Sequence, residues 1–323
     1  MSASHSETCL IPGPRPPLAE LTWSMPLDAF DDPYEALRGF PTRLSSRRYR
    51  LGPKLGRGAQ ASVRAAYDLR LRRPVALKFL ATPSQPGARR LQEEARILAG
   101  LRHPGVVRIY GSGRWRGIPA LVLEQVPGRS LKDLLERSGP LRWREGARLL
   151  EELFEAVAYV HEQGIVHRDI KLQNVIWGRA GLRLIDFGLA RPLVDPRELT
   201  RPGQVVGTPL YAAPERLQGQ DATPTSDVFS LGVSAFRLLS GAPPFDADRL
   251  DRLIALLQHA EPAPVPGLPE PLADVLARAL AKDPRERYSS AGELLRAWSR
   301  ARQRATAPRP RRLRPRSRAL TRR

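Results

Sequence analysis

Apolar and polar positions follow two different periods along this chain, and the change falls near residue 128. Before that point several short segments, the first two of them alternating, predict β-strands, and one segment has a helical period. The predicted strands are 49–55, a run ending at 67, 74–80, 106–110 and 120–124, and the predicted helix is 88–101. After residue 128 the apolar stripes are those of amphipathic helices. These helices are predicted at 131–136, 142–163, 226–240, 247–259, 271–281 and 289–302.

The two periods predict an α+β protein with a small five-stranded lobe carrying one helix, followed by a larger helical lobe. A cleft between two such lobes is the natural place for a ligand. The longest helix should bury the stripe made by Ala147, Leu150, Leu153, Phe154, Val157 and Val160.

The two ends of the chain differ in amino-acid composition from the central part. Residues 1–48 are rich in proline, and we expect a disordered leader whose role is either passive or docking. Residues 301–323 form an Arg-rich tail; residues 300–323 contain eleven arginines and no acid within a chain of net charge +20. The tail has no interleaved aromatic residues, so we favour a solvated, disordered segment over one that binds nucleic acid or an anionic membrane.

The remaining composition excludes several classes of protein. Cys9 is the only cysteine, which rules out an intrachain disulfide and a cysteine metal cluster and fits a reducing compartment. No apolar run approaches the length of a transmembrane helix, and no basic start precedes an apolar core at the N-terminus. We therefore expect a cytoplasmic protein without a membrane span.

The densest polar stretch is residues 167–174, whose sequence is His-Arg-Asp-Ile-Lys-Leu-Gln-Asn. It lies between the longest helix and the apolar run 182–185, and Asp186-Phe187-Gly188 follows directly. So many polar groups between two apolar segments indicate charge that is positioned for chemistry.

A glycine pair and a lysine in the first lobe point to phosphate. Gly56 and Gly58 lie between the first two strands, where backbone N–H groups can approach phosphate oxygens. This signal is weak alone, since glycines are common in hairpins and neither a Walker loop nor a Rossmann fingerprint is present. Lys78 follows on the third strand. Only five of the 53 basic residues are lysine, so a retained lysine suggests a need for a compact point charge.

Taken in order and spacing, these motifs resemble those of the protein kinase family, specifically the eukaryotic-like serine/threonine kinases of bacteria. The resemblance implies a kinase domain at 49–300, with an N-lobe at about 49–126 and a C-lobe at about 127–300. It also implies transfer of the γ-phosphate of ATP to Ser or Thr of protein substrates, with Mg²⁺, or alternatively Mn²⁺, as the metal.

The resemblance gives the first lobe an ATP-binding role. Gly56 and Gly58 would cover the phosphates, Val63 and Ala76 would enclose the adenine, and Lys78 would hold the α- and β-phosphates. Its carboxylate partner would be Glu94, with Glu93 as the alternative. Leu123 would control access to the back of the cleft, and Glu124 and Val126 would offer backbone hydrogen bonds to the adenine.

In the second lobe, the resemblance assigns catalysis to the polar stretch. Asp169 would orient the substrate hydroxyl and accept its proton, while Lys171 would steady the transferring phosphate and favour Ser/Thr over Tyr. Asn174 and Asp186 would hold the metal, because their hard oxygen atoms suit Mg²⁺. His167 and Phe187 would serve packing, against Leu98 and Ile109 of the other lobe.

Residues 186–215 resemble an activation segment. Thr200 is the best acceptor for regulatory autophosphorylation, and Arg168 could pair with the resulting phosphate. Thr208 would pack near the catalytic residues and shape the substrate site. Two contacts are expected to support this architecture: a pair between Glu215 and Arg287, and an anchor from Asp227 to residues 167–174, the catalytic loop.

Two other functions compete with this interpretation. A pseudokinase-type scaffold or binding module usually lacks the lysine, the catalytic aspartate or the metal aspartate, whereas Lys78, Asp169 and Asp186 are all present. A small-molecule phosphotransferase is disfavoured by the activation segment, which runs through Ala213-Pro214-Glu215.

Overall fold

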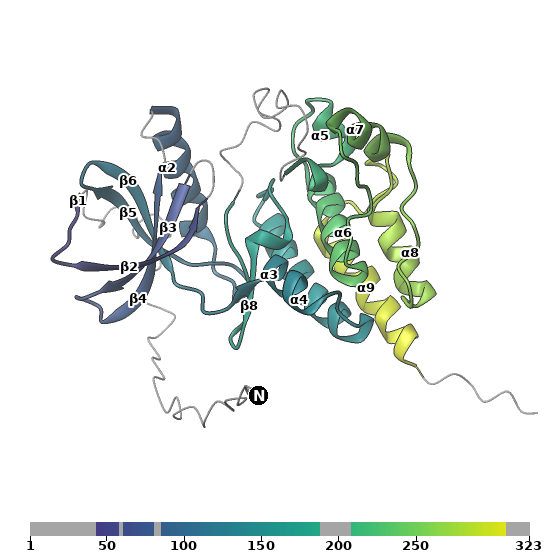
Figure 1. Cartoon of the computed structure of the whole chain (residues 1–323), viewed down its shortest axis with the longest axis horizontal. Coiled ribbons are helices and arrows are strands. Elements are labelled where there is room, and N and C mark those ends of the chain that lie inside the picture. Colours follow the sequence, from purple (N-terminus) through teal and green to yellow (C-terminus); the bar gives the residue numbers. More distant parts are fainter. Residues whose placement is uncertain (1–42, 58–60, 81–84, 188–207, 308–323) are drawn as a thin grey trace, which may run out of the picture.

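The computed structural model describes residues 43–57, 61–80, 85–187 and 208–307. A strand-rich lobe lies on one side and a helical lobe on the other, as the two periods of the sequence predict (Figure 1). The N-lobe sheet has the strand order β1-β5-β6-β4-β3-β2 and is covered on one face by α2. Its elements are β1 (Arg43–Leu44), β2 (Tyr49–Arg57), β3 (Ala61–Asp68), β4 (Arg73–Leu80), α2 (Gln85–Gly100), β5 (Ile109–Trp115) and β6 (Ile118–Glu124).

Five strands form as β2 to β6, although β5 shares only residues 109–110 with the predicted strand 106–110, and the short strand β1 adds a sixth. β1 pairs in parallel with β5 at the sheet edge, and Leu44 is buried in the same apolar cluster as Tyr49 and Trp115. Just after it, Arg48 donates to Asp68 with a nitrogen–oxygen distance of 2.9 Å. The folded lobe therefore includes residues ahead of position 49, where the sequence placed its start.

Strand β4 is buried on both faces because each face meets a different layer. Val75, Leu77 and Phe79 belong to the apolar cluster that also contains Trp115. Ala76 faces the opposite way and packs into the larger core, which continues into the C-lobe. A charged side chain on this inner face is thus held between the sheet and α2.

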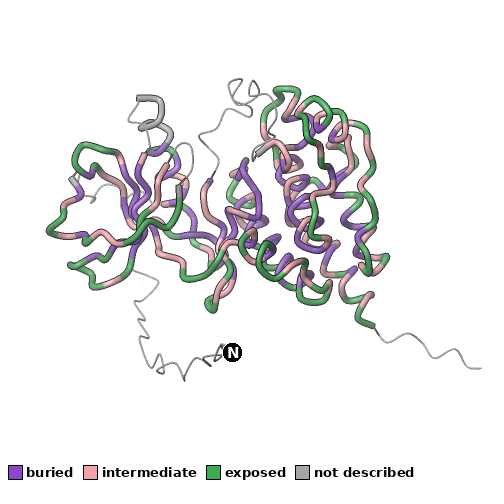
Figure 2. Tube along the Cα trace, viewed as in Figure 1, coloured by how far each residue is buried: buried purple, intermediate pink, exposed green. Residues whose placement is uncertain are grey.

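The C-lobe packs around α6 (Pro224–Ser240), which is buried over most of its length, and the other long helices each have a buried and an exposed face (Figure 2). The predicted stripe of the longest helix is confirmed, with each of its six members at most 1% exposed. The C-lobe elements are α3 (Leu131–Ser138), α4 (Trp143–Glu162), α5 (Pro214–Leu217), α6 (Pro224–Ser240), α7 (Leu250–His259), α8 (Glu270–Ala279), α9 (Ala291–Thr306) and the small sheet β7 (Arg129–Ser130), β8 (Val175–Gly178) and β9 (Gly181–Leu184). In the part of the chain that the structure describes, no helix is long and apolar enough to cross a membrane.

A buried ion pair between Glu215 and Arg287 joins two segments of the C-lobe. Both guanidinium Nη atoms of Arg287 donate to the Glu215 carboxylate, at 2.8 and 2.9 Å, and the same side chain donates to the carbonyls of Thr225, Ala281 and Lys282. The side chains of Arg287 and Glu215 are 0% and 6% exposed. This is the predicted pair, and it ties the end of the activation segment to the segment before α9.

Arg287→Met is expected to destabilise the protein by about 3–5 kcal/mol, because it leaves the Glu215 carboxylate buried without its cation. Urea unfolding followed by circular dichroism measures the change. Arg285→Met is the matched control, since Arg285 is 90% exposed and pairs with Asp283 in solvent. Equal unfolding midpoints for the two variants would contradict the structural role of the pair.

Candidate active site

Lys78 lies on the inner face of β4 and bridges two carboxylates. Its Nζ is 2.6 and 2.9 Å from the Glu94 oxygens and 2.5 Å from Asp186 Oδ1. Glu94 is brought there by the packing of α2 on the sheet, whereas Glu93 lies exposed beside Arg96. The structure therefore places Glu94, and not Glu93, against the lysine.

Glu94 and Asp186 keep the Lys78 side chain in its positively charged form. Burial alone would lower the pKa of Lys78, but the attraction of Asp186 and Glu94 outweighs it and raises that pKa above its ordinary value. Lys78 is 7% exposed, so a compact positive charge is held at a defined point beside Asp186. Such a charge suits the oxygens of a polyphosphate.

The catalytic loop gathers three polar side chains into one buried cluster. Lys171 Nζ donates to the Asp169 carboxylate at 2.7 and 2.9 Å, and Asn174 Nδ2 donates to the same carboxylate at 2.9 Å. Asn174 Nδ2 also donates to the backbone carbonyl of Asp169 at 2.8 Å. The short 3₁₀ turn Leu172–Asn174, anchored by the fully buried Leu172, sets this arrangement. The orientation of the Asp169 carboxylate is thus determined by its neighbours.

Asp227, at the start of α6, holds the catalytic loop from below. Its carboxylate accepts from the backbone N–H of His167 at 2.7 Å and from that of Arg168 at 3.0 Å. Arg168 has a φ of +72°, a conformation that a non-glycine residue adopts only when its surroundings hold it there. Asp186 likewise has a positive φ, of +59°. Asp227 therefore makes the anchoring contact that the resemblance implied.

His167 is a packing residue in this structure. Its ring is fully buried, lies 4.6 Å from the Phe187 ring between centroids, and accepts a hydrogen bond from the Asp169 N–H at 3.3 Å. Burial lowers the pKa of His167, which keeps the ring neutral. Phe187 shares a hydrophobic cluster with Leu98 and Ile109, so the apolar contact runs from one lobe to the other.

The predicted adenine-binding residues line one end of the sheet. Ala76 pairs with Leu123 across β4 and β6, and Val63 and Val126 pack against the same hydrophobic cluster. Glu124 directs its side chain to Arg183, 3.6 Å away, and to the Arg108 N–H. Its side chain is therefore engaged within the protein, and its backbone N–H donates to the Arg108 carbonyl at 2.8 Å, so only other backbone groups of this segment could bind a base.

Space above the sheet is open at Gly56. A Cβ built at this position would meet no atom of the protein within 4 Å, so packing does not require a glycine there. Gly56 pairs with Val63 of β3, and Val63 pairs in turn with Lys78 of β4. A glycine with open space at this place fits the close approach of a bound phosphate chain. Gly58 lies outside the described residues.

The predicted regulatory residues are placed only in part. Thr200 lies outside the described residues, and Thr208 begins the 3₁₀ turn Thr208–Tyr211. That turn is held by Ser230, which donates to the Tyr211 carbonyl at 2.8 Å, and by Arg237, which donates to the Tyr211 hydroxyl at 3.0 Å. Arg168 is exposed on the catalytic loop.

The donor set fits a divalent cation that is bound together with a phosphate. Asn174 uses its amide nitrogen within the loop, which leaves its amide oxygen for a metal, and Asp186 is 43% exposed. Within the described residues, no group of three or more His, Cys, Asp or Glu side chains could hold a metal by itself. One carboxylate and one amide oxygen, completed by phosphate oxygens and water, are a usual Mg²⁺ environment.

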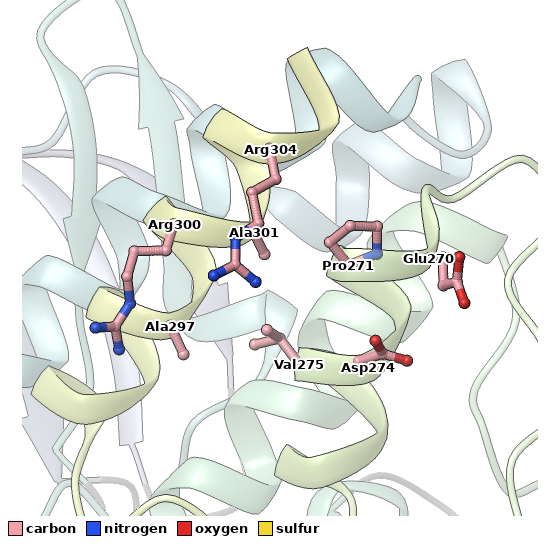
Figure 3. Close-up of a pocket in the computed structure, with 8 residues that line it drawn as sticks. All are labelled: Glu270, Pro271, Asp274, Val275, Ala297, Arg300, Ala301 and Arg304. Atoms are coloured by element: carbon pink, nitrogen blue, oxygen red, sulfur yellow. The ribbon is translucent and has the colours of Figure 1, made fainter. Parts of the chain in front are cut away.

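A cavity of about 390 Å³ lies between α8 and α9 (Figure 3), and neither Lys78 nor Asp169 lines it. Arg300 and Arg304 project from α9, and Val275 lies on the α8 side of the groove. Nothing in the structure indicates an occupant, and the cavity is separate from the site between the lobes.

Comparison with known proteins defines the class of this molecule. The protein kinase domain pattern matches residues 49–299, and the chain belongs to the protein kinase family. Two of its relatives within that family are bacterial serine/threonine kinases. It is 34% identical over 268 residues to "Serine/threonine-protein kinase PknB" of Mycobacterium leprae, which covers 79% of this chain and 43% of the relative. It is 36% identical over 273 residues to "Probable serine/threonine-protein kinase PknB" of Bifidobacterium longum, covering 78% and 39%.

The chain thus spans less than half the length of these curated relatives. Among solved structures, the fold is similar to that of Rad53 residues 1–466 in complex with AMP-PNP. The TM-score is 0.66 at 25% identity, and the match covers 78% of this chain and 65% of the other. These findings confirm the predicted family and two-lobed fold.

One residue of the site carried no prediction from the sequence. His161, at the end of α4, contacts Asp227 with its Nε2 atom 3.1 Å from Oδ2. The available signal was its place four residues after Val157 in the apolar stripe, which directs it into the core.

Proposed function

We propose that this chain is a protein serine/threonine kinase that transfers the γ-phosphate of ATP to hydroxyls of proteins, with Mg²⁺ as the preferred metal and Mn²⁺ as an alternative. The observation that carries the proposal is the assembly of Lys78, Glu94 and Asp186 opposite the buried cluster of Asp169 and Lys171. The family supports ATP and divalent-metal use in general, and the names of the relatives support Ser/Thr substrates.

Each residue has a defined task in this proposal. Asp169, held by Lys171 and Asn174, orients the substrate hydroxyl and takes its proton as the new oxygen–phosphorus bond forms. Lys171 neutralises charge on the transferring phosphoryl group, and Lys78 holds the phosphates that remain on the leaving ADP. Asn174 and Asp186 would hold the metal, which supplies further charge neutralisation when it is bound.

The test of the proposal uses γ-labelled ATP with the purified chain and a generic basic protein. We expect label on the chain itself and on the substrate in Mg²⁺, less in Mn²⁺, and none with a chelator. Acid hydrolysis should recover phosphoserine and phosphothreonine and no phosphotyrosine. Nucleotide binding without transfer would support the competing scaffold, and label on a small molecule alone would support a small-molecule phosphotransferase.

We further propose that phosphorylation of Thr200 activates the enzyme by pairing with the exposed Arg168, while Thr208 shapes the substrate site. The support is the position of Arg168, whose backbone Asp227 fixes next to Asp169. A cytoplasmic location stays a prediction. Neither the fold nor the comparisons support binding of nucleic acid or membrane by the Arg-rich tail, whose described part is the end of α9.

Thr200→Ala is expected to lower kcat about 10-fold or more, because the phosphate that would pair with Arg168 cannot form. Mass spectrometry of active wild-type enzyme should find Thr200 phosphorylated. Thr306→Ala, at the exposed end of α9, is the control and should retain full activity. Full activity of Thr200→Ala, with Thr200 unmodified in the active wild type, would refute this regulation.

A further inference from the structure

His161 connects the last helix of the domain to the catalytic loop. Its side chain is 4% exposed, and its two ring nitrogens make different contacts. Nε2 lies 3.1 Å from Asp227 Oδ2, and Nδ1 lies 3.1 Å from the backbone nitrogen of Ala291. Ala291 is the first residue of α9, so one imidazole joins α4, α6 and α9.

The contact with Ala291 determines where the ring proton lies. A backbone N–H can only donate, so Nδ1 must accept and carries no proton. The neutral ring then has its proton on Nε2, from which it donates to Asp227. The N–H of Ala291 is one of the helix N–H groups that lack an intrahelical partner, and His161 supplies that partner.

Asp227 consequently receives three donors. The ring of His161 and the backbone N–H of His167 both donate to Oδ2, and the N–H of Arg168 donates to Oδ1. The last two hold the backbone immediately before Asp169, including the left-handed conformation of Arg168. Loss of the imidazole donor would leave Asp227 held by the two backbone groups alone, so its carboxylate, and with it the loop conformation, would be less firmly fixed.

We propose that His161 is a positioning residue. It fixes the Asp227 carboxylate, and through it the backbone that presents Asp169, and α9 fixes His161 in the required tautomer. The proposal rests on the kinase activity proposed above. It makes α9 a part of the catalytic apparatus, and α9 is itself tied to α4 by Trp298, whose Nε1 donates to the Ala147 carbonyl at 3.0 Å.

Two substitutions separate the two contacts of the ring. In His161→Gln the amide nitrogen takes the place of Nε2, so the donor to Asp227 is kept and the contact with Ala291 is lost. In His161→Asn the shorter amide takes the place of Nδ1, so Ala291 keeps its partner and Asp227 loses its donor. Asn is one methylene shorter than Gln and leaves a larger void, so the stability of each variant is measured beside its activity.

We expect His161→Asn to lower kcat about 10- to 100-fold relative to His161→Gln, because a hydrogen bond to a charged group is lost. The KM for ATP should change less than about threefold, since Lys78 and Glu94 are not affected. Melting temperatures measured by circular dichroism should show that both variants are folded at the assay temperature, with His161→Asn the less stable because it leaves the larger void. Equal kcat values for Asn and Gln variants that are both folded would overturn the positioning role.

A second readout does not depend on activity. Nitrogen NMR of histidine-labelled protein distinguishes a protonated from an unprotonated ring nitrogen, and the chain has only five histidines. The signal that disappears in His161→Gln belongs to His161, and it should show a proton on Nε2 and none on Nδ1. The opposite tautomer, or a doubly protonated ring, would overturn the inference. An inactive wild type with the expected tautomer would instead refute the proposed function.

Discussion

Asp169→Asn should lower kcat by about 10²- to 10⁴-fold, the usual contribution of a positioned general base. The asparagine keeps the shape of the side chain and can still accept from Lys171, but it cannot take the proton of the substrate hydroxyl. Because Asp169 is buried and held by Lys171 and Asn174, water does not readily replace it. The KM for ATP should remain nearly unchanged, since Lys78 and Glu94, which bind on the phosphate side, are not altered by the substitution.

The measurement is steady-state transfer of labelled phosphate to a protein substrate, together with nucleotide binding to the same preparation. Asp274→Asn is the matched control, because Asp274 is an exposed aspartate on α8 outside the cleft. Wild-type transfer by Asp169→Asn would remove Asp169 from the reaction and the main support for the proposed mechanism. Loss of nucleotide binding as well would show that the substitution disturbed the fold.

The fold was predictable wherever a period extends over several residues. Strands β2 and β3 were recognisable from alternation, β4 and β6 from short apolar runs that are buried on both faces, and α4 from its uninterrupted apolar stripe. Strand β5 was expected at 106–110 and forms at Ile109–Trp115, because Gly111 and Gly113 interrupt its apolar pattern. Strand β1 has two residues, too few for any period, and it exists because Leu44 fills the sheet edge beside Trp115.

The residues of the candidate site also differ in how far the sequence could predict them. Local motifs identified Asp169, Lys171 and Asn174, which lie within six residues of one another. The contact of Lys78 with Asp186 joins residues 108 positions apart, so the sequence named both residues without their distance. His161 was missed because its role depends on the N-terminus of α9, and no local pattern reports which backbone N–H a side chain will meet.

Lys78→Met should reduce kcat/KM for ATP by about 30- to 3,000-fold, equivalent to the roughly 2–5 kcal/mol lost when one member of a buried charge pair is truncated. Methionine fills the volume of lysine and carries no charge. Glu94 and Asp186, which share the Lys78 ammonium, would then repel each other across the cleft. The loss should therefore include displacement of α2 in addition to the missing phosphate contact.

Lys78→Arg tests whether this position requires a lysine, because arginine is the basic residue at nearly every other basic position of this chain. A planar guanidinium keeps the charge but cannot place it at a single point within 2.6 Å of both Glu94 and Asp186. We expect Lys78→Arg to lose most of the activity that Lys78→Met loses, while the exposed Lys54→Arg on β2 stays fully active. Hydrogen exchange of α2 separates the two causes: faster exchange in Lys78→Met than in Lys78→Arg indicates repulsion between the carboxylates. Activity retained by Lys78→Arg would show that charge alone suffices there, and that the scarcity of lysine elsewhere says nothing about Lys78.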